Sequence, residues 1–233
     1  MKFLITPYFK HNLLLPSCRG LLTALNEYSS TLNIKIDKQL IRWGFSPSQP
    51  KDYRPHESAH IKAEAVSDES LYEIIDKYKE IDSIPLDISD HARRAFLDNY
   101  TRNLPNTFGK SNMVYLKETP LTENIKTQIQ SLINTNKKIE AQTGAFWYPD
   151  NGYMSWHTNE NHTGFRIYCA YSFKEKSSYF KYRDPETKEI VTCWDDFGWN
   201  VRVFKVGRTP KDRLWHCVHS DTDRISIGFS VEE

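Results

Sequence analysis

The sequence has no long hydrophobic run, no closely paired cysteines and no excess of charge of one sign. No apolar segment approaches the length of a membrane span, and the run after Met1 is broken at Pro7 and Lys10, unlike a signal peptide. The 31 Lys and Arg residues balance 30 Asp and Glu residues, so the basic excess typical of proteins that bind nucleic acid phosphates is missing. We therefore expect no membrane segment and no strong nucleic-acid binding.

The four cysteines are widely spaced, and none of them forms a CxxC pair. In a chain of 233 residues, this spacing is typical of free thiols rather than of a zinc site or a disulfide framework. Because neither a signal peptide nor a membrane span is recognisable, the free thiols favour a cytoplasmic protein.

The sequence predicts one domain over residues 1–233, in which 39% hydrophobic residues suffice for a core. Its character changes near residue 140: residues 1–140 are expected to be helical support and lid elements, and 141–233 to form the core that carries the site. A Pro-, Ser- and Lys-rich segment, 43–60, predicts a long loop that could act as a lid or be passive. Apolar residues at helical spacing predict helices around 21–32, 71–78 with Ser67 as N-cap, 92–100 with Ser89 as N-cap, and 120–133 opened by Thr119-Pro120.

After residue 140, short segments of β-branched and aromatic residues lie between turn signals and predict strands. They are 146–148, 153–159, 165–173, 178–183, 199–206, 214–219 and 224–231. Helices followed by strands is the order of an α+β fold, in which helices cover one face of a sheet. We therefore expect a β-sandwich or β-barrel that is buttressed by N-terminal helices.

The last predicted strand places Arg224 and Ser226 on one face, one strand step apart. A guanidinium and a hydroxyl in this arrangement can bind a carboxylate, although a solvated sheet face with a surface arginine is the common alternative. The preceding strand carries His216 among apolar neighbours, and the short turn that follows can bring His216 and Arg224 into one cavity. A core histidine with an ordinary hydrogen bond is the alternative for His216.

A third element is the predicted hairpin that ends in His157-Thr158-Asn159. A histidine and an oxygen donor two residues apart project from one strand face, and a histidine from another strand can complete a three-ligand metal site with one side open. His157, Asn159 and His216 fit this pattern. His162 and His219 are alternative imidazoles, but His219 faces away from His216 on its strand.

At these residues the chain resembles the iron(II)- and 2-oxoglutarate-dependent oxygenases, whose pattern is a hairpin leading into His-x-Asp, a later His, and Arg-x-Ser on the last strand. The resemblance covers roughly residues 140–233 and implies a double-stranded β-helix (jelly-roll) core. It implies that Fe(II) is bound by the three metal-ligand candidates. It further implies that 2-oxoglutarate chelates the metal and reaches Arg224 and Ser226 with its far carboxylate, with a supporting hydrogen bond from Tyr168.

The resemblance also implies a reaction in which O2 and 2-oxoglutarate yield succinate and a hydroxylated substrate. That substrate is unidentified, either a small molecule or a macromolecular side chain. Aromatic residues near the expected mouth could stack on a flat substrate or simply fill the ends of the barrel. They are Trp147, Tyr153, Trp156, Trp194 and Trp199.

The chain departs from the family pattern at Asn159, where the family has an acidic ligand. An amide oxygen brings no negative charge, so weaker metal binding is expected. Three alternatives stay open: Asn159 is a weaker ligand, Glu160 replaces it, or the position is effectively vacant, as in related halogenases; we prefer the first. At the level of function, the alternatives are a non-catalytic barrel that binds a metabolite or partner, and a cupin-type metal enzyme without 2-oxoglutarate.

Overall fold

The computed structural model describes residues 59–83, 111–115, 120–132, 138–160 and 162–231. The helices predicted at 21–32 and 92–100 lie outside these residues, as does nearly all of the predicted lid segment. The organisation of residues 1–233 as one domain stays a prediction.

Three helices are described: α4 (Ala59–Ala65), α5 (Asp68–Asp82) and α7 (Pro120–Leu132). The start of α5 is as predicted, because the backbone N–H of Ser70 donates a hydrogen bond to Ser67 Oγ over 3.1 Å. The loop predicted over 43–60 was wrong at its end, where α4 begins; this helix is too short to show periodicity in the sequence. Among the described residues, no helix is long and apolar enough to cross a membrane.

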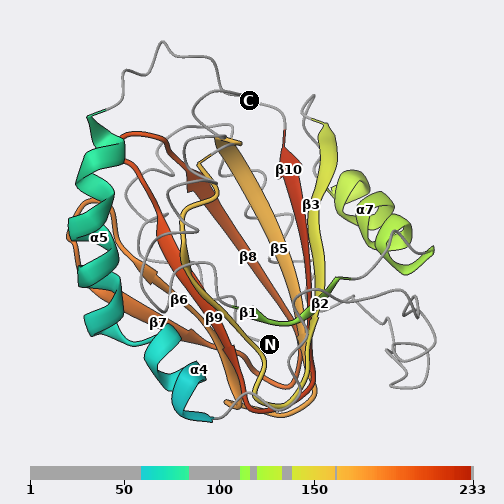
Figure 1. Cartoon of the computed structure of the whole chain (residues 1–233). Helices are drawn as coiled ribbons and strands as arrows, with labels where there is room; N and C mark the ends of the chain where they lie inside the picture. The colour runs from blue at the N-terminus through green and yellow to red at the C-terminus, as the bar shows by residue number, and fades with distance from the viewer. Residues whose placement is uncertain (1–58, 84–110, 116–119, 133–137, 161, 232–233) are drawn as a thin grey trace.

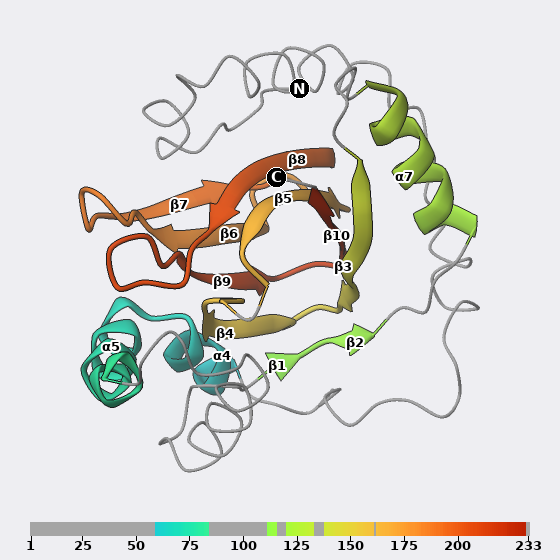
Figure 2. The same cartoon turned by 90° about the horizontal axis from the view of Figure 1, so that it is seen from above.

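Two antiparallel five-stranded sheets form the core (Figure 1). The first sheet has the order β1-β4-β9-β6-β7 and the second has the order β2-β3-β10-β5-β8. Strands β3 to β6 alternate between the sheets, and so do β7 to β10, which is the winding of a double-stranded β-helix. Figure 2 shows the strands as a ring seen along this winding. The strands are β1 (Ser111–Asn112), β2 (Val114–Tyr115), β3 (Ile139–Tyr148), β4 (Tyr153–His157), β5 (Gly164–Ser172), β6 (Ser178–Arg183), β7 (Ile190–Trp194), β8 (Gly198–Val206), β9 (Trp215–Ser220) and β10 (Arg224–Val231).

The predicted jelly-roll core with helical support is therefore confirmed, and most predicted strands lie within one or two residues of their predicted bounds. The two-residue strands β1 and β2 are too short to be predicted from a pattern. The edge strand β7 was not predicted either, although Ile190–Trp194 has β-branched and aromatic residues typical of a strand. The prediction also extended β4 to residue 159, whereas the strand ends at His157. This difference matters for the site.

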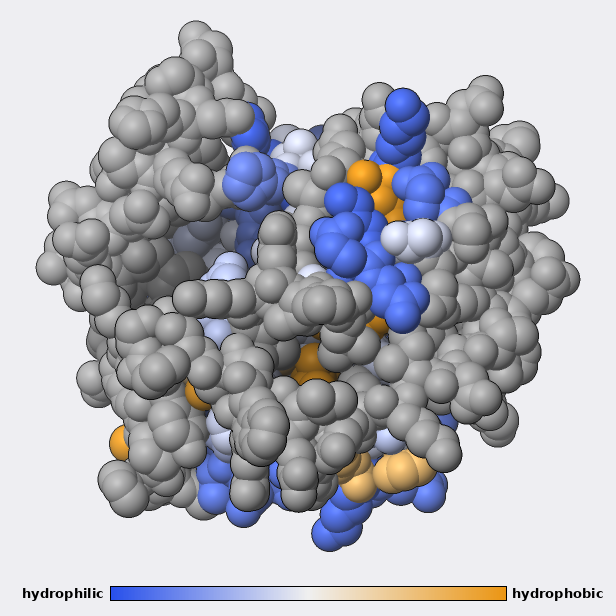
Figure 3. Space-filling view, turned by 90° about the vertical axis from the view of Figure 1, so that its right-hand side faces the viewer, coloured by the Kyte–Doolittle hydropathy of each residue, from blue (hydrophilic) through white to orange (hydrophobic). Residues whose placement is uncertain are grey.

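Helices cover the outer faces of both sheets. Trp156 and Trp215 point outward from the first sheet and share a buried cluster with Leu71 and Ile74 of α5, and the indole N–H of Trp156 donates to the Ser67 carbonyl over 2.7 Å. On the other side, α7 lies beside β3 (Figure 2) and buries Ile125. On the side of the molecule that carries α7, most of the described residues at the surface are hydrophilic (Figure 3). The barrel interior is thus left to side chains that point inward from both sheets.

Candidate metal and co-substrate site

The two predicted histidines lie directly opposite each other on neighbouring strands. His157 of β4 pairs with His216 of β9, and their ring centroids are 4.1 Å apart. Between Met154 and His157 the register shifts, so that three steps on β4 match two on β9. Without this bulge, strand alternation would turn Met154 and His157 to opposite faces. With it, both side chains line the same cavity.

Backbone carbonyls fix the orientation of both imidazoles. His157 Nδ1 lies 2.8 Å from the Ser155 carbonyl oxygen, and His216 Nδ1 lies 2.9 Å from the Leu214 carbonyl oxygen. A carbonyl can only accept, so each Nδ1 carries the proton and each Nε2 keeps its lone pair. Burial lowers the pKa of His157 to about 4; burial and the neighbouring His157 also lower the pKa of His216 well below its ordinary value. Both rings are neutral at pH 7, which is the form that binds metals.

These lowered pKa values predict that the metal-free protein loses stability in mild acid. As pH falls through 6.5, the ordinary value, imidazoles in the unfolded chain take up protons, whereas His157 in the folded chain stays neutral to about pH 4. The unfolded state therefore binds more protons in this window, and the free energy of unfolding falls as pH falls. We expect the melting temperature to drop by several degrees between about pH 7 and pH 5, and less in His157→Gln. A slope as steep in His157→Gln as in the wild type would contradict this assignment.

Asn159 reaches the histidine pair, but by a route other than the predicted one. It lies beyond the end of β4 with a φ of 56°, so a turn rather than strand alternation brings its side chain back to the site; asparagine tolerates this conformation better than most residues. Its Nδ2 lies 3.0 Å from His216 Nε2 and donates to the Tyr168 hydroxyl over 3.2 Å. The structure thus brings His157, Asn159, His216 and Tyr168 together.

Glu160, the alternative metal ligand, is directed away from the site. Its carboxylate accepts a hydrogen bond from Arg213 Nε over 2.7 Å, and both side chains are buried. Arg213 also binds Asp82 of α5 at 2.6 Å. A buried pair of this kind is costly to break, because it would leave one charge uncompensated. Glu160 therefore anchors the chain after β4 beneath α5 and does not serve as a metal ligand in this conformation.

The histidines open into a small cavity of about 50 Å³, which is room for a few water-sized groups. Ser226 and Gly228 of β10 also line it; a Cβ at residue 228 would lie 2.7 Å from the Tyr168 ring, so glycine is needed there. None of the five aromatic residues considered for substrate stacking lines this cavity. The lining consists of Thr143, Gly144, Phe146, Tyr148, Met154, His157, Asn159, Tyr168, His216, Val218, Ser226 and Gly228.

The remaining histidine candidates lie elsewhere. The ring of His219 stacks on Tyr179 with centroids 4.5 Å apart, and its Nε2 lies 2.8 Å from Asp221 Oδ2. His162 is exposed, and its carbonyl accepts a hydrogen bond from Arg166. Neither residue lines the cavity.

Arg224 is buried, as a clamp residue should be, but it is already paired. Its Nε donates to Asp195 Oδ2 over 2.7 Å, and both side chains are almost fully buried. Asp195 Oδ1 accepts from Arg202 Nη2 over 2.5 Å. Ser226, one step along β10, lines the cavity, whereas Arg224 does not. The predicted Arg-Ser pair is therefore divided between the cavity and an interior ion cluster.

The residues present fit a divalent metal, and fit 2-oxoglutarate only in part. Two neutral imidazoles present Nε2 to one cavity, and the Asn159 side chain can offer an amide oxygen as a third donor. The described residues contain no group of three His, Cys, Asp or Glu residues placed to hold a metal, because the third member here is an amide. For the co-substrate, Ser226 is accessible from the cavity, and Arg224 is bound to Asp195.

The sequence did not predict Asp195 and Arg202 as residues of the site. Arg202 lies between Val201 and Val203, on the same face of β8 as Phe204 and Val206. A charged residue at such an inward position needs a buried partner. Asp195 directly follows Trp194, at the end of the unpredicted strand β7. The isolated arginine was a usable signal, but the sequence does not indicate which acid pairs with it.

Comparison with known proteins adds little beyond the fold. No protein-family model and no curated protein matches the chain. Among solved structures, it is similar to a 2OG-Fe(II) oxygenase family protein from Burkholderia pseudomallei, with 11% identity, TM-score 0.38, and coverage of 72% of this chain and 92% of that one. A prolyl hydroxylase from Trichoplax adhaerens, in complex with a hypoxia-inducible factor peptide, has 15% identity, TM-score 0.38, and coverage of 59% and 74%. A cupin domain from Bordetella pertussis has 12% identity, TM-score 0.26, and coverage of 40% and 85%. Such distant likeness does not assign a reaction.

Proposed function

We propose that this chain is an iron(II)- and 2-oxoglutarate-dependent oxygenase that hydroxylates a substrate not yet identified. The observation that supports this proposal best is the pair of neutral imidazoles, His157 and His216, with both Nε2 atoms directed to one cavity. Carbonyl-bound Nδ1 atoms of this kind commonly orient metal-binding histidines. The substrate is a small molecule or a macromolecular side chain.

The residues of the chain bind, orient and shield the reactants. His157 and His216 would hold the metal, with Asn159 as a weak third ligand. Ser226 and Tyr168 would donate hydrogen bonds to an oxo acid in the cavity; burial raises the pKa of Tyr168 to about 12, so its hydroxyl keeps its proton. Bound iron with 2-oxoglutarate would supply the oxidising chemistry from O2, and the protein's contribution would be position and exclusion of water.

Calorimetry and product analysis test this proposal. We expect Mn(II) to bind the wild-type protein with one site per chain, and 2-oxoglutarate at millimolar concentration to release heat only when the metal is present. The Fe(II)-loaded protein in air should form succinate slowly, even without its substrate. Absence of metal binding would remove the proposal.

A non-catalytic barrel is the second candidate, and two observations favour it. The metal position has an amide in place of an acid, and the Asn159 amide nitrogen already contacts His216 Nε2. Arg224 is held by Asp195 rather than free for a ligand. Metal binding without any succinate formation, at saturating 2-oxoglutarate, would favour this candidate over the oxygenase.

We also propose that the protein works in the cytoplasm. Cys169, Cys193 and Cys217 are buried free thiols in the core, and burial raises the pKa of the Cys169 thiol to about 12. Unpaired core thiols are typical of proteins from reducing compartments.

A further inference from the structure

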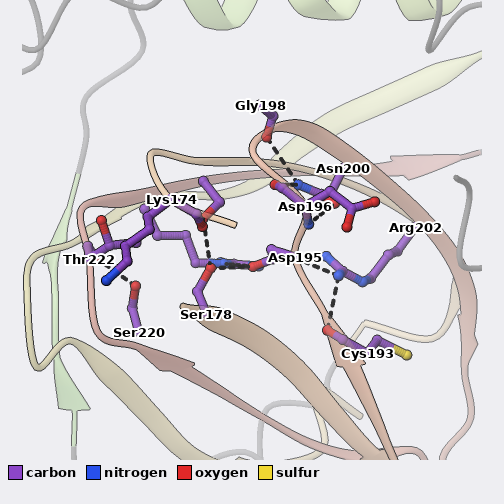
Figure 4. A network of polar contacts seen from close by, with 12 residues as sticks. Lys174, Ser178, Cys193, Asp195, Asp196, Gly198, Asn200, Arg202, Ser220 and Thr222 are labelled. Atoms are coloured by element: carbon purple, nitrogen blue, oxygen red, sulfur yellow. Dashed lines mark hydrogen bonds and ion pairs between the residues drawn. The ribbon is translucent and has the colours of Figure 1, made fainter. Parts of the chain in front are cut away.

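A cluster of buried charges lies inside the barrel next to the cavity. Asp195, after β7, receives hydrogen bonds from Arg224 of β10, from Arg202 of β8 and from the Ser178 hydroxyl of β6 at 2.6 Å. Figure 4 shows part of this network, with Asp195 between Ser178 and Arg202. The four side chains are each no more than 2% exposed. The cluster therefore joins both sheets and is closed to solvent.

Within this cluster, Asp195 is a carboxylate bound by arginine, which is the contact that a dicarboxylic co-substrate would need. Burial by itself would raise the pKa of Asp195, but Arg202 and Arg224 outweigh it and hold this pKa well below its usual range. The side chain is thus ionised at pH 7. Being part of the chain, it meets Arg224 without the entropy cost of bringing in a free ligand.

The cluster is still incomplete as an ionic site. Two guanidinium groups share one carboxylate, and Arg224 Nη1, Arg202 Nη1 and Arg202 Nε are buried without a hydrogen-bond partner. Unsatisfied buried donors are costly. Asp195 already occupies Arg224 Nε and Arg202 Nη2, so another carboxylate can bridge these two arginines only in its place. The cavity stops short of them, since it is lined by Ser226 and Tyr148 but not by either arginine.

We infer that Asp195 is an internal competitor for the carboxylate position of Arg224, and so determines which oxo acid the cavity accepts. In the wild type a ligand that carries a second carboxylate must displace Asp195, and binding is weak. An oxo acid without a second carboxylate needs no such displacement. This inference rests on the proposed function only for the identity of the ligand; the competition at Arg224 is a property of the chain itself.

The test is to remove the competitor and offer a free carboxylate. Asp195→Ala should melt at a lower temperature than the wild type, because two buried guanidinium groups lose their anion. Added 2-oxoglutarate or succinate should raise the melting temperature of this variant and leave the metal-free wild type nearly unchanged. By calorimetry, the variant should bind the dicarboxylate roughly tenfold or more tightly than the wild type.

Two further variants keep the test decisive. Asp195→Asn keeps the size of the side chain, and should show the same gain if the alanine variant does not fold. Asp184→Ala removes another buried aspartate, which accepts N–H groups of Glu186 and Thr187 in the turn after β6, so dicarboxylates should not rescue its stability. The inference is overturned if the wild type binds 2-oxoglutarate as tightly as both Asp195 variants. Failure of the proposed function is separate, because it appears as loss of Mn(II) binding in every variant.

Discussion

His216→Ala is expected to abolish metal binding. His216 lies at the centre of the site: its Nε2 faces the cavity, its ring is 4.1 Å from that of His157, and it is fully buried. Changes to groups that only orient a metal ligand cost about ten- to a hundredfold in affinity. Loss of one of two imidazoles should cost more, so we expect the affinity for Mn(II) or Co(II) to fall more than about a hundredfold, measured by calorimetry.

The matched control is His219→Ala on the same strand. His219 points to the outer face of the barrel, where it stacks on Tyr179 and contacts Asp221, so this variant removes an imidazole without touching the cavity. It should lower stability slightly and leave metal affinity unchanged. Equal losses of affinity in the two variants would show that the metal binds elsewhere.

The direction of each side chain on β9 follows from the strand period of two. Trp215 and Cys217 point to α5, while His216 and Val218 point inward. The convergence of His157 and His216 could therefore be predicted. The bulge in β4 could not, because the one-residue slip that it introduces is selected by packing against β9 rather than by a local signal.

The ion pair between Arg224 and Asp195 also could not be predicted from the sequence. The sequence predicts that Arg224 and Ser226 share one face of β10, but in the structure only Ser226 lines the cavity and Arg224 binds Asp195. The partner of Arg224 depends on which strands close the barrel. Asp195 approaches from β7, whose place at the edge of the first sheet is a matter of topology. Sequence patterns give the direction of a side chain and leave open what occupies the space in front of it.

Asn159→Asp is expected to strengthen metal binding. The amide nitrogen of Asn159 contacts His216 Nε2 at 3.0 Å, so the amide must turn to present its oxygen to a metal, whereas a carboxylate presents oxygen in either orientation. A carboxylate also adds a negative charge beside a dication. A tenfold gain in affinity corresponds to about 1.4 kcal/mol. The attraction between a carboxylate and a dication at ligand distance exceeds this energy, so we expect at least about tenfold tighter Mn(II) binding.

The backbone gives this substitution a close control. Asn159 and Asn151 both have positive φ, 56° and 62°, a conformation that aspartate also tolerates. Asn151 lies in the turn between β3 and β4, where its side-chain oxygen accepts from Lys62, so Asn151→Asp makes the same chemical change outside the cavity. If Asn159→Asp gains affinity and Asn151→Asp does not, residue 159 touches the metal, and its amide accounts for weak binding in the wild type. If Asn159→Asp gains nothing, residue 159 is not a ligand, and His157 and His216 hold the metal without a third protein group.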